Sequence, residues 1–427
     1  MVFMVQARNI FCFLKTFGTD RRGNTTVLFA LCLPVLIGSA GLGLEAGFWQ
    51  LQQRQLQTSA DMAAYAGAVS LRNNESRQQA YGEAEAEALL HEYDPAVASI
   101  TTTSPPTSGR YRNNRSMEVE ITHTVPRLFS QIFDEAPVSF TVRAVATYDE
   151  ASDACVLALS PEGSRAIDLS GSSNIALIEC EIMSNSIAPD AVSLGGSTDV
   201  VAPCINSVGG FSVNGGSADY TLTGCAAPRT DLPRAQDPYA DVPPPPIPNS
   251  CSNIPGGGPH SSTTVTAGAG GVKRFCNGVN INGDVTFEPG IYIIDRGDFR
   301  VGANANLNAE GVTFYLTGGA RTRFNGSADI NIRAPAAGTY EGIAIFADRE
   351  DEGVAHIFNG TANSRITGAI YTPAGDISFQ GDFSGQNGCM QLVGNTVTVT
   401  GNANITTDCS GIGVEWAEVP SDVRLVE

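Results

Sequence analysis

The sequence predicts three parts: an N-terminal transmembrane helix, a small α+β unit, and an all-β C-terminal region folded as a right-handed parallel β-helix, or solenoid. Three observations support this fold class. A run of 22 uncharged residues lies near the N-terminus, apolar and polar residues alternate within 117–147, and a short Gly- and Asn-containing repeat recurs from residue 171 onward. A long apolar run is typical of a membrane helix, period-two alternation of strands, and a short repeat of solenoids.

Length and charge limit the function classes. The chain has 427 residues, enough for roughly two or three domains, and a formal net charge of −19. Nucleic acid is therefore not expected as a partner, because its phosphates would be repelled. Residues 1–44 carry four basic side chains against Asp20, a net of +3, so the remainder carries −22. By the positive-inside rule, the N-terminus is expected in the cytoplasm and the acidic bulk on the other side of the membrane.

The uncharged stretch covers residues 23–44, between two arginines and an acidic residue. At ~1.5 Å per residue, a helix of this length spans about 33 Å, close to the ~30 Å hydrocarbon core of a bilayer. We expect a transmembrane helix over 23–47, preceded by a cytoplasmic tail over 1–22. A proline in the middle of such a helix is tolerated in membranes. The residues assigned to this anchor are Gly23, Leu28, Pro34, Gly41, Leu44 and Glu45.

Two other interpretations compete with a retained helix. A cleaved signal peptide would have a shorter apolar core, although Gly-Ser-Ala at 38–40 offers small residues for cleavage. A twin-arginine signal would begin at the Arg-Arg pair of 21–22, but the Gly-Asn-Thr that follows suits it poorly. We favour the retained span. Glu45 is then an interfacial residue at its end, with a functional intramembrane carboxylate as the alternative.

Beyond the anchor, the spacing of apolar residues predicts a helical extension over 48–93, whose second helix covers 75–93. Strand-like alternation over 117–124 and 138–147 predicts a small α+β unit over 94–150. Between these strands lies the segment PRLFSQIF, in which a proline suits the first position of a short helix. The apolar residues expected to share one face of that helix are Leu128, Phe129, Ile132 and Phe133.

The N-terminal features occur in a distinctive order: Arg-Arg-Gly-Asn at 21–24, the apolar stretch, an acidic residue near its end, and LQTSADMAAYAGA at 56–68. This order resembles the N-terminal domain of TadG-like proteins of the Tad/Flp (tight adherence) pilus-assembly system, over about residues 20–70. The resemblance implies a bitopic envelope protein whose partners are the lipid bilayer and other pilus-assembly or envelope proteins. Leu28 stands where the pilins of that system carry Glu after a cut at Gly23, so processing there is not expected.

The C-terminal region, residues 151–427, consists of short alternating runs separated by Gly, Asn and Ser. A motif recurs in it: Gly, two small or polar residues, Asn or Asp, and then a hydrophobic residue, often at spacings of about 19 to 25 residues. This pattern predicts a β-helix whose coils bury apolar side chains and pair with the coils above and below, while Gly and Asn form the corners. The five clearest copies begin at Gly171, Gly196, Gly216, Gly326 and Gly401.

Cysteine usage agrees with export. Cys12 and Cys32 lie before or within the anchor, and the other eight of ten cysteines lie in the C-terminal region. An even number suits disulfides in an oxidising compartment, and most neighbouring cysteines are one coil apart, so we expect disulfides between adjacent coils. Their connectivity stays open, and free buried thiols are the alternative. The cysteines expected in disulfides are Cys155, Cys180, Cys204, Cys225, Cys251, Cys276, Cys389 and Cys409.

Residues 227–260 interrupt the repeats with ten prolines. They are predicted to form an extended loop or linker between two blocks of coils, with a proline-recognition ligand as the alternative. A Cys-containing coil block, this insert, and then EPGIYIID, GVTFYLTG and GAIYTPAG follow one another in the chain. That order resembles the β-helical C-terminal region of some proteins of the pilus-assembly group.

No motif predicts a metal site, a cofactor or a catalytic centre. Asp168 begins a match to D-x-S-x-S, the metal-binding motif of von Willebrand A domains, but the match is one copy of the repeat. The acidic run at 348–352 is interpreted as a solvated loop, with a Ca²⁺ site as the alternative. The four histidines are scattered, and His123 is interpreted as a core or edge residue of its strand. We therefore expect neither a cofactor nor enzyme activity.

Two function classes fit these features. The first is a non-enzymatic, single-pass protein of the bacterial inner membrane, with its N-terminus cytoplasmic and its bulk periplasmic or surface-facing. It would take part in Tad/Flp pilus assembly or anchoring and in surface attachment. The alternative is a membrane-tethered β-helix enzyme, a polysaccharide lyase or hydrolase, or an adhesin that binds a surface glycan. A charged groove on the solenoid would favour the enzyme, and a face of Ser, Thr, Asn and Gly would favour a scaffold.

Overall fold

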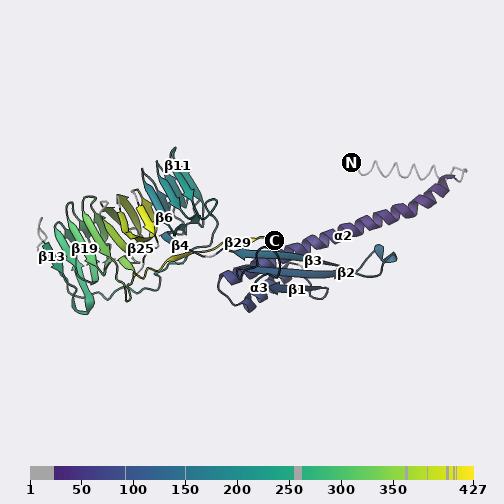
Figure 1. Ribbon diagram of the computed structural model, residues 1–427, viewed down its shortest axis with the longest axis horizontal. Coiled ribbons are helices and arrows are strands. Elements are labelled where there is room, and N and C mark those ends of the chain that lie inside the picture. Colours follow the sequence, from purple (N-terminus) through teal and green to yellow (C-terminus); the bar gives the residue numbers. More distant parts are fainter. Residues whose placement is uncertain are drawn as a thin grey trace. The chain divides into compact units, whose positions relative to one another are not determined.

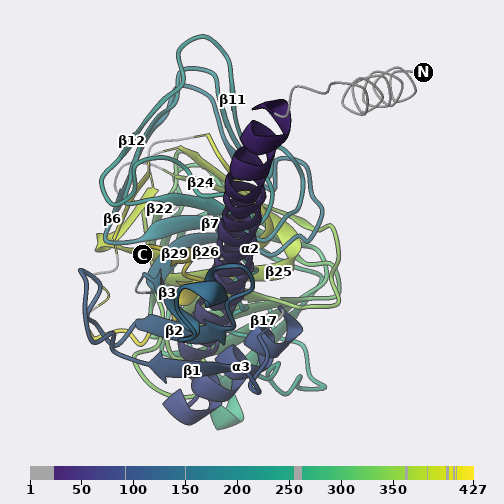
Figure 2. The same cartoon turned by 90° about the vertical axis from the view of Figure 1, so that its right-hand side faces the viewer.

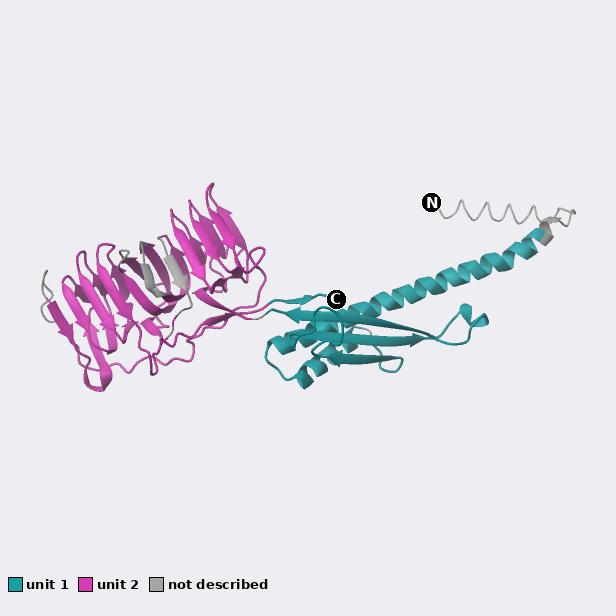
Figure 3. Cartoon of the chain, in the orientation of Figure 1, with its two compact units in different colours: residues 1–149, 422–427 teal, residues 150–421 magenta. Residues whose placement is uncertain are grey.

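The computed structural model describes residues 24–91, 93–149, 151–253, 262–360, 364–381, 383–400, 403–406, 409 and 411–427. The chain forms two compact units, coloured separately in Figure 3: unit 1 contains Met1–Asp149 and Asp422–Glu427, and unit 2 contains Glu150–Ser421. Unit 2 is therefore an insertion into the chain of unit 1. Gly23 and the predicted cytoplasmic tail lie outside the described residues.

Unit 1 combines two helices with an antiparallel sheet, in agreement with the predicted anchor helix and small α+β unit. The helices are α2 (Asn24–Arg72) and α3 (Arg77–Leu90). The strands, in their order in the sheet, are β1 (Ala98–Thr103), β2 (Ser116–Val125), β3 (Val138–Tyr148) and β29 (Val423–Leu425). One 3-10 turn, η1 (Ser130–Ile132), lies between β2 and β3.

The core of unit 1 lies between the helices and one face of the sheet. α2 lies beside β2 and β3 in both views (Figure 1, Figure 2). Gly67 of α2 faces the sheet, and a Cβ there would lie 2.8 Å from the Met117 side chain, so helix and sheet are in close contact. The helices contribute small side chains to this core, and small side chains allow their backbones to approach closely. The buried alanines of the two helices are Ala60, Ala63, Ala64, Ala68, Ala80, Ala84 and Ala88.

The C-terminal strand belongs to unit 1, which corrects the predicted solenoid range of 151–427. β29 pairs antiparallel with β3, with Val423 opposite Tyr148. The Glu427 carboxylate accepts hydrogen bonds from the Arg110 backbone N–H at 2.7 Å and from Arg143 Nη1 at 2.6 Å. These donors lower the pKa of the Glu427 carboxyl. The last residues are thus fixed to unit 1 by both pairing and charge.

Unit 2 is a parallel β-solenoid of about 10 turns, which confirms the predicted all-β class. Strands one coil apart pair in parallel and in register, as in β17 with β20 and β18 with β21. Its strands are β4 (Ser152–Ala158), β5 (Ile167–Leu169), β6 (Asn174–Ile178), β7 (Glu181–Ser184), β8 (Val192–Gly195), β9 (Asp199–Ala202), β10 (Ile205–Ser207), β11 (Phe211–Asn214), β12 (Asp219–Leu222), β13 (Ser262–Val265), β14 (Val272–Cys276), β15 (Val279–Ile281), β16 (Asp284–Phe287), β17 (Gly290–Asp295), β18 (Asp298–Val301), β19 (Asn306–Glu310), β20 (Val312–Thr317), β21 (Arg321–Phe324), β22 (Asp329–Arg333), β23 (Ile343–Ala347), β24 (Ala355–Gly360), β25 (Arg365–Gly381), β26 (Phe383–Val399), β27 (Ala403–Thr406) and β28 (Ala417–Val419), with the 3-10 turn η2 (Ala269–Gly271) before β14.

The coils do not stack in chain order. Along one face of the solenoid, the paired strands follow the order β10-β7-β4-β26-β25-β23-β20-β17-β14. The first block of coils, β4 to β12, therefore extends away from the second block, β13 to β27. The last coil of the second block pairs with the first coil of the first through β26–β4, β26–β5 and β27–β6. The first and last coils of unit 2 thus meet in the middle of one continuous ladder.

Glycine forms corners where successive coils approach most closely. Gly171 and Gly196 begin two successive copies of the repeat, and their φ angles are 95° and 70°. A Cβ on Gly196 would lie 2.3 Å from the Gly171 carbonyl oxygen, so a larger residue does not fit there. In these two copies, the repeat recognised in the sequence therefore marks a corner of the solenoid.

The Pro-rich insert connects the far ends of the two blocks. Its described part, residues 227–253, is called the Pro-rich segment below. From β10 to β14 the ladder has eight strand spacings of ~4.8 Å, or about 38 Å, and an extended chain rises ~3.1 Å per residue, so the segment is long enough for this path. Its hydrogen bonds follow the stacking order of the coils: Ala235 with Asn185, Tyr239 with Gln391, Val242 with Arg349, and Pro248 with Arg274.

Four disulfides join cysteines that are neighbours in the sequence, which confirms the expected disulfides and resolves their connectivity. Cys204 immediately precedes β10, and its partner Cys225 lies just before the Pro-rich segment. Cys276 ends β14, and its partner lies near the end of that segment. Both ends of the Pro-rich segment are thus covalently tied to the solenoid. The four pairs are Cys155–Cys180, Cys204–Cys225, Cys251–Cys276 and Cys389–Cys409.

Candidate membrane-anchor site

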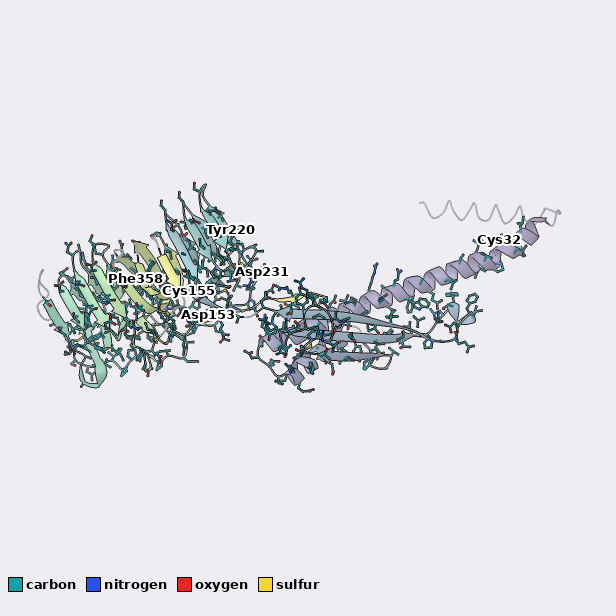
Figure 4. All side chains as sticks on the ribbon, in the orientation of Figure 1. Cys32, Asp153, Cys155, Tyr220, Asp231 and Phe358 are labelled. Carbon is teal, nitrogen blue, oxygen red and sulfur yellow. A yellow bond between two sulfur atoms is a disulfide. The ribbon has the colours of Figure 1, made fainter. Side chains whose placement is uncertain are left out.

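The N-terminal part of α2 is apolar and uncovered. Its described side chains from residue 28 to residue 40 are all exposed, and they include Leu28 and Pro34 of the predicted anchor. Cys32, labelled in Figure 4, is a free thiol on this part of the helix. Among the described residues, α2 is the one helix that is long and apolar enough to cross a membrane. This agrees with the predicted anchor.

Protein cover on α2 begins at Gly41. Gly41 and Glu45 are buried and Trp49 is half-buried, and a spacing of four residues places all three on one face of the helix. That face contacts the loop between β2 and β3, residues 126–137, which we call the β2–β3 loop. A Cβ on Gly41 would lie 2.7 Å from the Phe129 ring, so the glycine allows this ring to lie directly on the helix backbone. Leu44, the other predicted anchor residue here, is exposed.

Glu45 attaches the β2–β3 loop to the helix. Its Oε1 accepts a hydrogen bond from the Leu128 N–H at 2.6 Å, and its Oε2 accepts one from the Ser130 N–H at 2.8 Å. The residue is 1% exposed. A buried carboxylate without such donors would be strongly unfavourable. Glu45, expected from the sequence as an interfacial residue at the end of the span, is therefore also the docking residue for this loop.

Arg127 closes the β2–β3 loop. Its Nε donates to the Ala136 carbonyl at 2.7 Å, and its Nη2 lies 2.9 Å from Asp134 Oδ2. The guanidinium carbon lies 5.8 Å from the centroid of the Trp49 ring, which is a cation–π contact with α2. The loop is therefore fastened to the helix at Gly41, Glu45 and Trp49, and its two ends are joined to each other.

The apolar side chains of the β2–β3 loop are exposed, and the short helix predicted over 126–133 is wrong. Only the 3-10 turn η1 forms, because the Ser130 N–H, which an α-helix would use internally, is bound to Glu45 instead. The loop therefore has no buried apolar face. The exposed fractions are 58% for Leu128, 46% for Phe129, 86% for Ile132 and 82% for Phe133. The sequence signal was present, since four large apolar residues in so short a connection need an apolar partner.

The helix that carries this site also carries the similarity to known proteins. Residues 23–70 match the Tad family model. That model describes TadE/G-like Flp pilus-assembly proteins, and the match confirms the resemblance found in the N-terminal sequence. It supports a role in Tad/Flp pilus assembly. No curated protein and no solved structure matches the chain.

Outside the Tad segment, the motifs considered for metal binding are engaged in local contacts. Asp168 lies in β5 and forms an ion pair with Arg165. In the acidic run, Asp348 accepts a hydrogen bond from the Thr317 hydroxyl at 2.7 Å, and Asp351 accepts one from a backbone N–H at 2.9 Å. Within the described ranges, no group of three or more His, Cys, Asp or Glu side chains is arranged to hold a metal ion.

His356 is buried inside the solenoid, which the sequence pattern did not predict. It lies in β24 and is 0% exposed, and its Nδ1 accepts a hydrogen bond from the Thr322 N–H at 3.4 Å. Burial disfavours the charged imidazolium and lowers the pKa of His356 to about 4, although the nearby Asp376 carboxylate opposes this shift.

We expect the solenoid to lose stability as the pH falls from 6.5 to about 4. In this pH range an unfolded histidine binds a proton that the folded His356 does not. The contribution of neutral His356 to the free energy of unfolding is therefore fully present above pH 6.5 and is lost progressively as the pH falls toward 4. The difference between the two pKa values corresponds to about 3 kcal/mol. Urea unfolding at pH 7 and at pH 4.5 measures the loss, which should be smaller in His356→Gln. An equal loss in both proteins would contradict this assignment.

Proposed function

We propose that the protein is a non-enzymatic, single-pass envelope protein of the inner membrane that works in Tad/Flp pilus assembly or anchoring and in surface attachment. Its N-terminus would lie in the cytoplasm and its solenoid in the periplasm or at the cell surface. The observation that carries this proposal is the Tad match over residues 23–70, which falls on the one candidate membrane helix of the described chain. Its partners would be the bilayer and other pilus or envelope proteins.

Charge and cysteine chemistry support this orientation. Residues 1–44 carry a net charge of +3 and the rest of the chain −22, and basic segments are retained on the cytoplasmic side. The four disulfides lie in unit 2, and disulfides persist in oxidising compartments such as the periplasm. Both properties favour export of the solenoid.

The polar outer strands of the solenoid support a scaffold rather than an enzyme. Arg321 and Arg323 of β21 both pair with Asp298 of β18, at 2.8 Å and 3.2 Å, so one carboxylate bridges both arginines of the next coil. On another face, Asn331 donates to Asn308 at 2.8 Å across neighbouring coils. Such ladders of paired polar groups stabilise the stacking of coils and leave a displayed surface.

Deletion of the gene for this chain, followed by imaging of pili and a surface-attachment assay, tests the proposal. We expect loss of pili or of attachment, restored by the full chain. A second complementing variant, which keeps unit 1 and lacks unit 2, tests the roles of the two units separately. Because Tyr148 and Val423 lie opposite each other in the β3–β29 pair, an Asn-Gly turn can replace residues 149–422. Attachment lost while pili persist would assign surface attachment to the solenoid. Normal pili and attachment in the deletion strain would refute the proposal.

A further inference from the structure

The β2–β3 loop carries an apolar surface that unit 1 does not cover. Ile132 and Phe133 are the most exposed large apolar residues of the described chain, and Leu128 beside them is also exposed. A cluster of this kind marks contact with an apolar partner. At the base of the loop, Arg127 and Asp134 form an ion pair, whereas Glu135 is exposed. The tip of the loop is therefore apolar, and its base carries one carboxylate, Glu135, beyond the Arg127–Asp134 pair.

The loop is fixed at one level along α2. The Glu45 carboxylate accepts hydrogen bonds from two backbone N–H groups of the loop, those of Leu128 and Ser130. The Phe129 ring lies on Gly41, where a side chain on the helix would collide with it. These contacts hold the apolar tip beside residues 41–45 of the helix.

That level coincides with the end of the apolar stretch. The charges that flank the stretch in the sequence are Arg22 and Glu45. A ~30 Å hydrocarbon core takes about 20 residues at ~1.5 Å each, so a core that begins at Asn24 ends near residue 43. Trp49 lies about 9 Å beyond residue 43 along the helix, at the depth of the headgroups, where tryptophan is enriched. The loop tip therefore lies at the hydrocarbon boundary.

We infer that the β2–β3 loop is a second membrane contact, which inserts Ile132 and Phe133 among the lipid acyl chains beside α2. The inference rests on the proposed function in one respect, that α2 crosses the membrane. Lipid is the partner because the loop surface continues the apolar surface of the helix, whose Leu42 and Leu44 are exposed at the same level. An apolar environment that surrounds those leucines would therefore also surround the loop tip.

A membrane anchor with two contacts, α2 and the β2–β3 loop, has less orientational freedom than a single helix. A single helix can tilt and rotate in a bilayer, and its orientation is set by packing and by interfacial residues. With the loop inserted on the Glu45 face, tilting α2 away from that face or shifting it along the membrane normal would move Ile132 and Phe133 out of the lipid. The loop therefore restricts the tilt of α2 and the height of unit 1 relative to the membrane surface.

Environment-sensitive probes in the full chain test this inference. Cys12 and Cys32 are replaced by serine, the disulfides are left intact, and an NBD fluorophore is attached to one new cysteine at a time. The probe replaces Ile132 in the loop, Ile37 in α2, or Leu90 at the end of α3, all of them exposed, so folding does not depend on them. The protein is reconstituted in phosphatidylethanolamine–phosphatidylglycerol vesicles, with doxyl-labelled lipid as the membrane quencher and iodide as the aqueous quencher.

Leu90 is the matched control. It is 77% exposed and apolar, but the preceding turn of α3 contacts Ser59, about 21 Å further along α2 than Glu45. We expect blue-shifted emission and loss of fluorescence with doxyl lipid at positions 37 and 132, and quenching by iodide at position 90.

The outcomes separate this inference from the proposed function. If the probe at 37 is lipid-quenched and the probe at 132 is quenched by iodide, the anchor stands and the loop insertion is overturned. If neither quencher reaches the probe at 132, a protein covers the loop and lipid insertion is likewise overturned. If the probe at 37 is also exposed to iodide, the membrane anchor of the proposed function fails as well.

Discussion

Replacing Arg349 by alanine is expected to lower the free energy of unfolding of the solenoid by about 2–4 kcal/mol. Arg349 follows β23, midway along the path of the Pro-rich segment. Its guanidinium donates to the carbonyls of Tyr239 and Val242 and to the Tyr371 hydroxyl, and it lies 5.1 Å from the centroid of the Phe346 ring. Its removal leaves two carbonyls and one hydroxyl without their donor and releases the middle of the segment.

Guanidinium unfolding of the full chain in micelles, with the disulfides intact, measures this loss. The matched control is Arg300→Ala, an exposed arginine of β18, which should change the free energy by no more than about 0.5 kcal/mol. Trypsin should also cleave after Arg234 in the Pro-rich segment faster in the Arg349 variant than in the control. Equal destabilisation by the two variants would mean that lost positive charge, and not the release of the segment, is responsible.

The solenoid could be predicted because each coil carries its own local signals. A corner glycine such as Gly196 is required by contacts to Gly171 one coil away, and the motif that contains both recurs with about the period of the coil. Most of the cysteines follow the same period, so disulfides between adjacent coils could be expected, although their connectivity could not be deduced. These signals consist of residue types at regular spacings, so they can be recognised in a single sequence.

The order of the two blocks could not be predicted. The contact between the last coil and the first is a parallel ladder of backbone groups, β26 with β4, and it resembles the contact between any other two coils. Backbone donors and acceptors carry no residue-specific signal. The Pro-rich segment indicated that two blocks exist, but nothing in it indicated that the chain would return to its starting coil.

Only part of the membrane-anchor site could be predicted from the sequence, for a similar reason. The apolar stretch of α2 is a local pattern, whereas Glu45 binds backbone N–H groups 83 and 85 residues away. The spacing of Leu128, Phe129, Ile132 and Phe133 fits one helix face, so local periodicity favoured a helix where a distant carboxylate holds a loop. The role of Arg349 could not be predicted either, because it lies in the acidic run at 348–352, which was interpreted by its carboxylates alone.

Replacing Phe314 by alanine is expected to destabilise the solenoid by about 3–5 kcal/mol, the cost of a large cavity in a packed interior. Phe314 of β20 is fully buried, and its ring centroid lies 5.1 Å from Phe287, 6.0 Å from Tyr292 and 4.7 Å from Phe299. Each ring pair adds to the apolar burial. The surrounding coils cannot close the cavity by moving together, because their backbones are held at the spacing of the ladder.

The control for Phe314→Ala is Ile178→Ala in β6, which removes a large apolar side chain that is exposed and should cost well under about 1 kcal/mol. Hydrogen exchange then tests how the loss is distributed. Because each coil of a solenoid contacts only its neighbours, protection should fall most in β17, β18 and β20 and least in β7 and β8 of the first block. An equal loss of protection in both blocks would show that the Pro-rich segment and the β26–β4 ladder couple them into one cooperative unit, in which local opening is no longer the route to exchange.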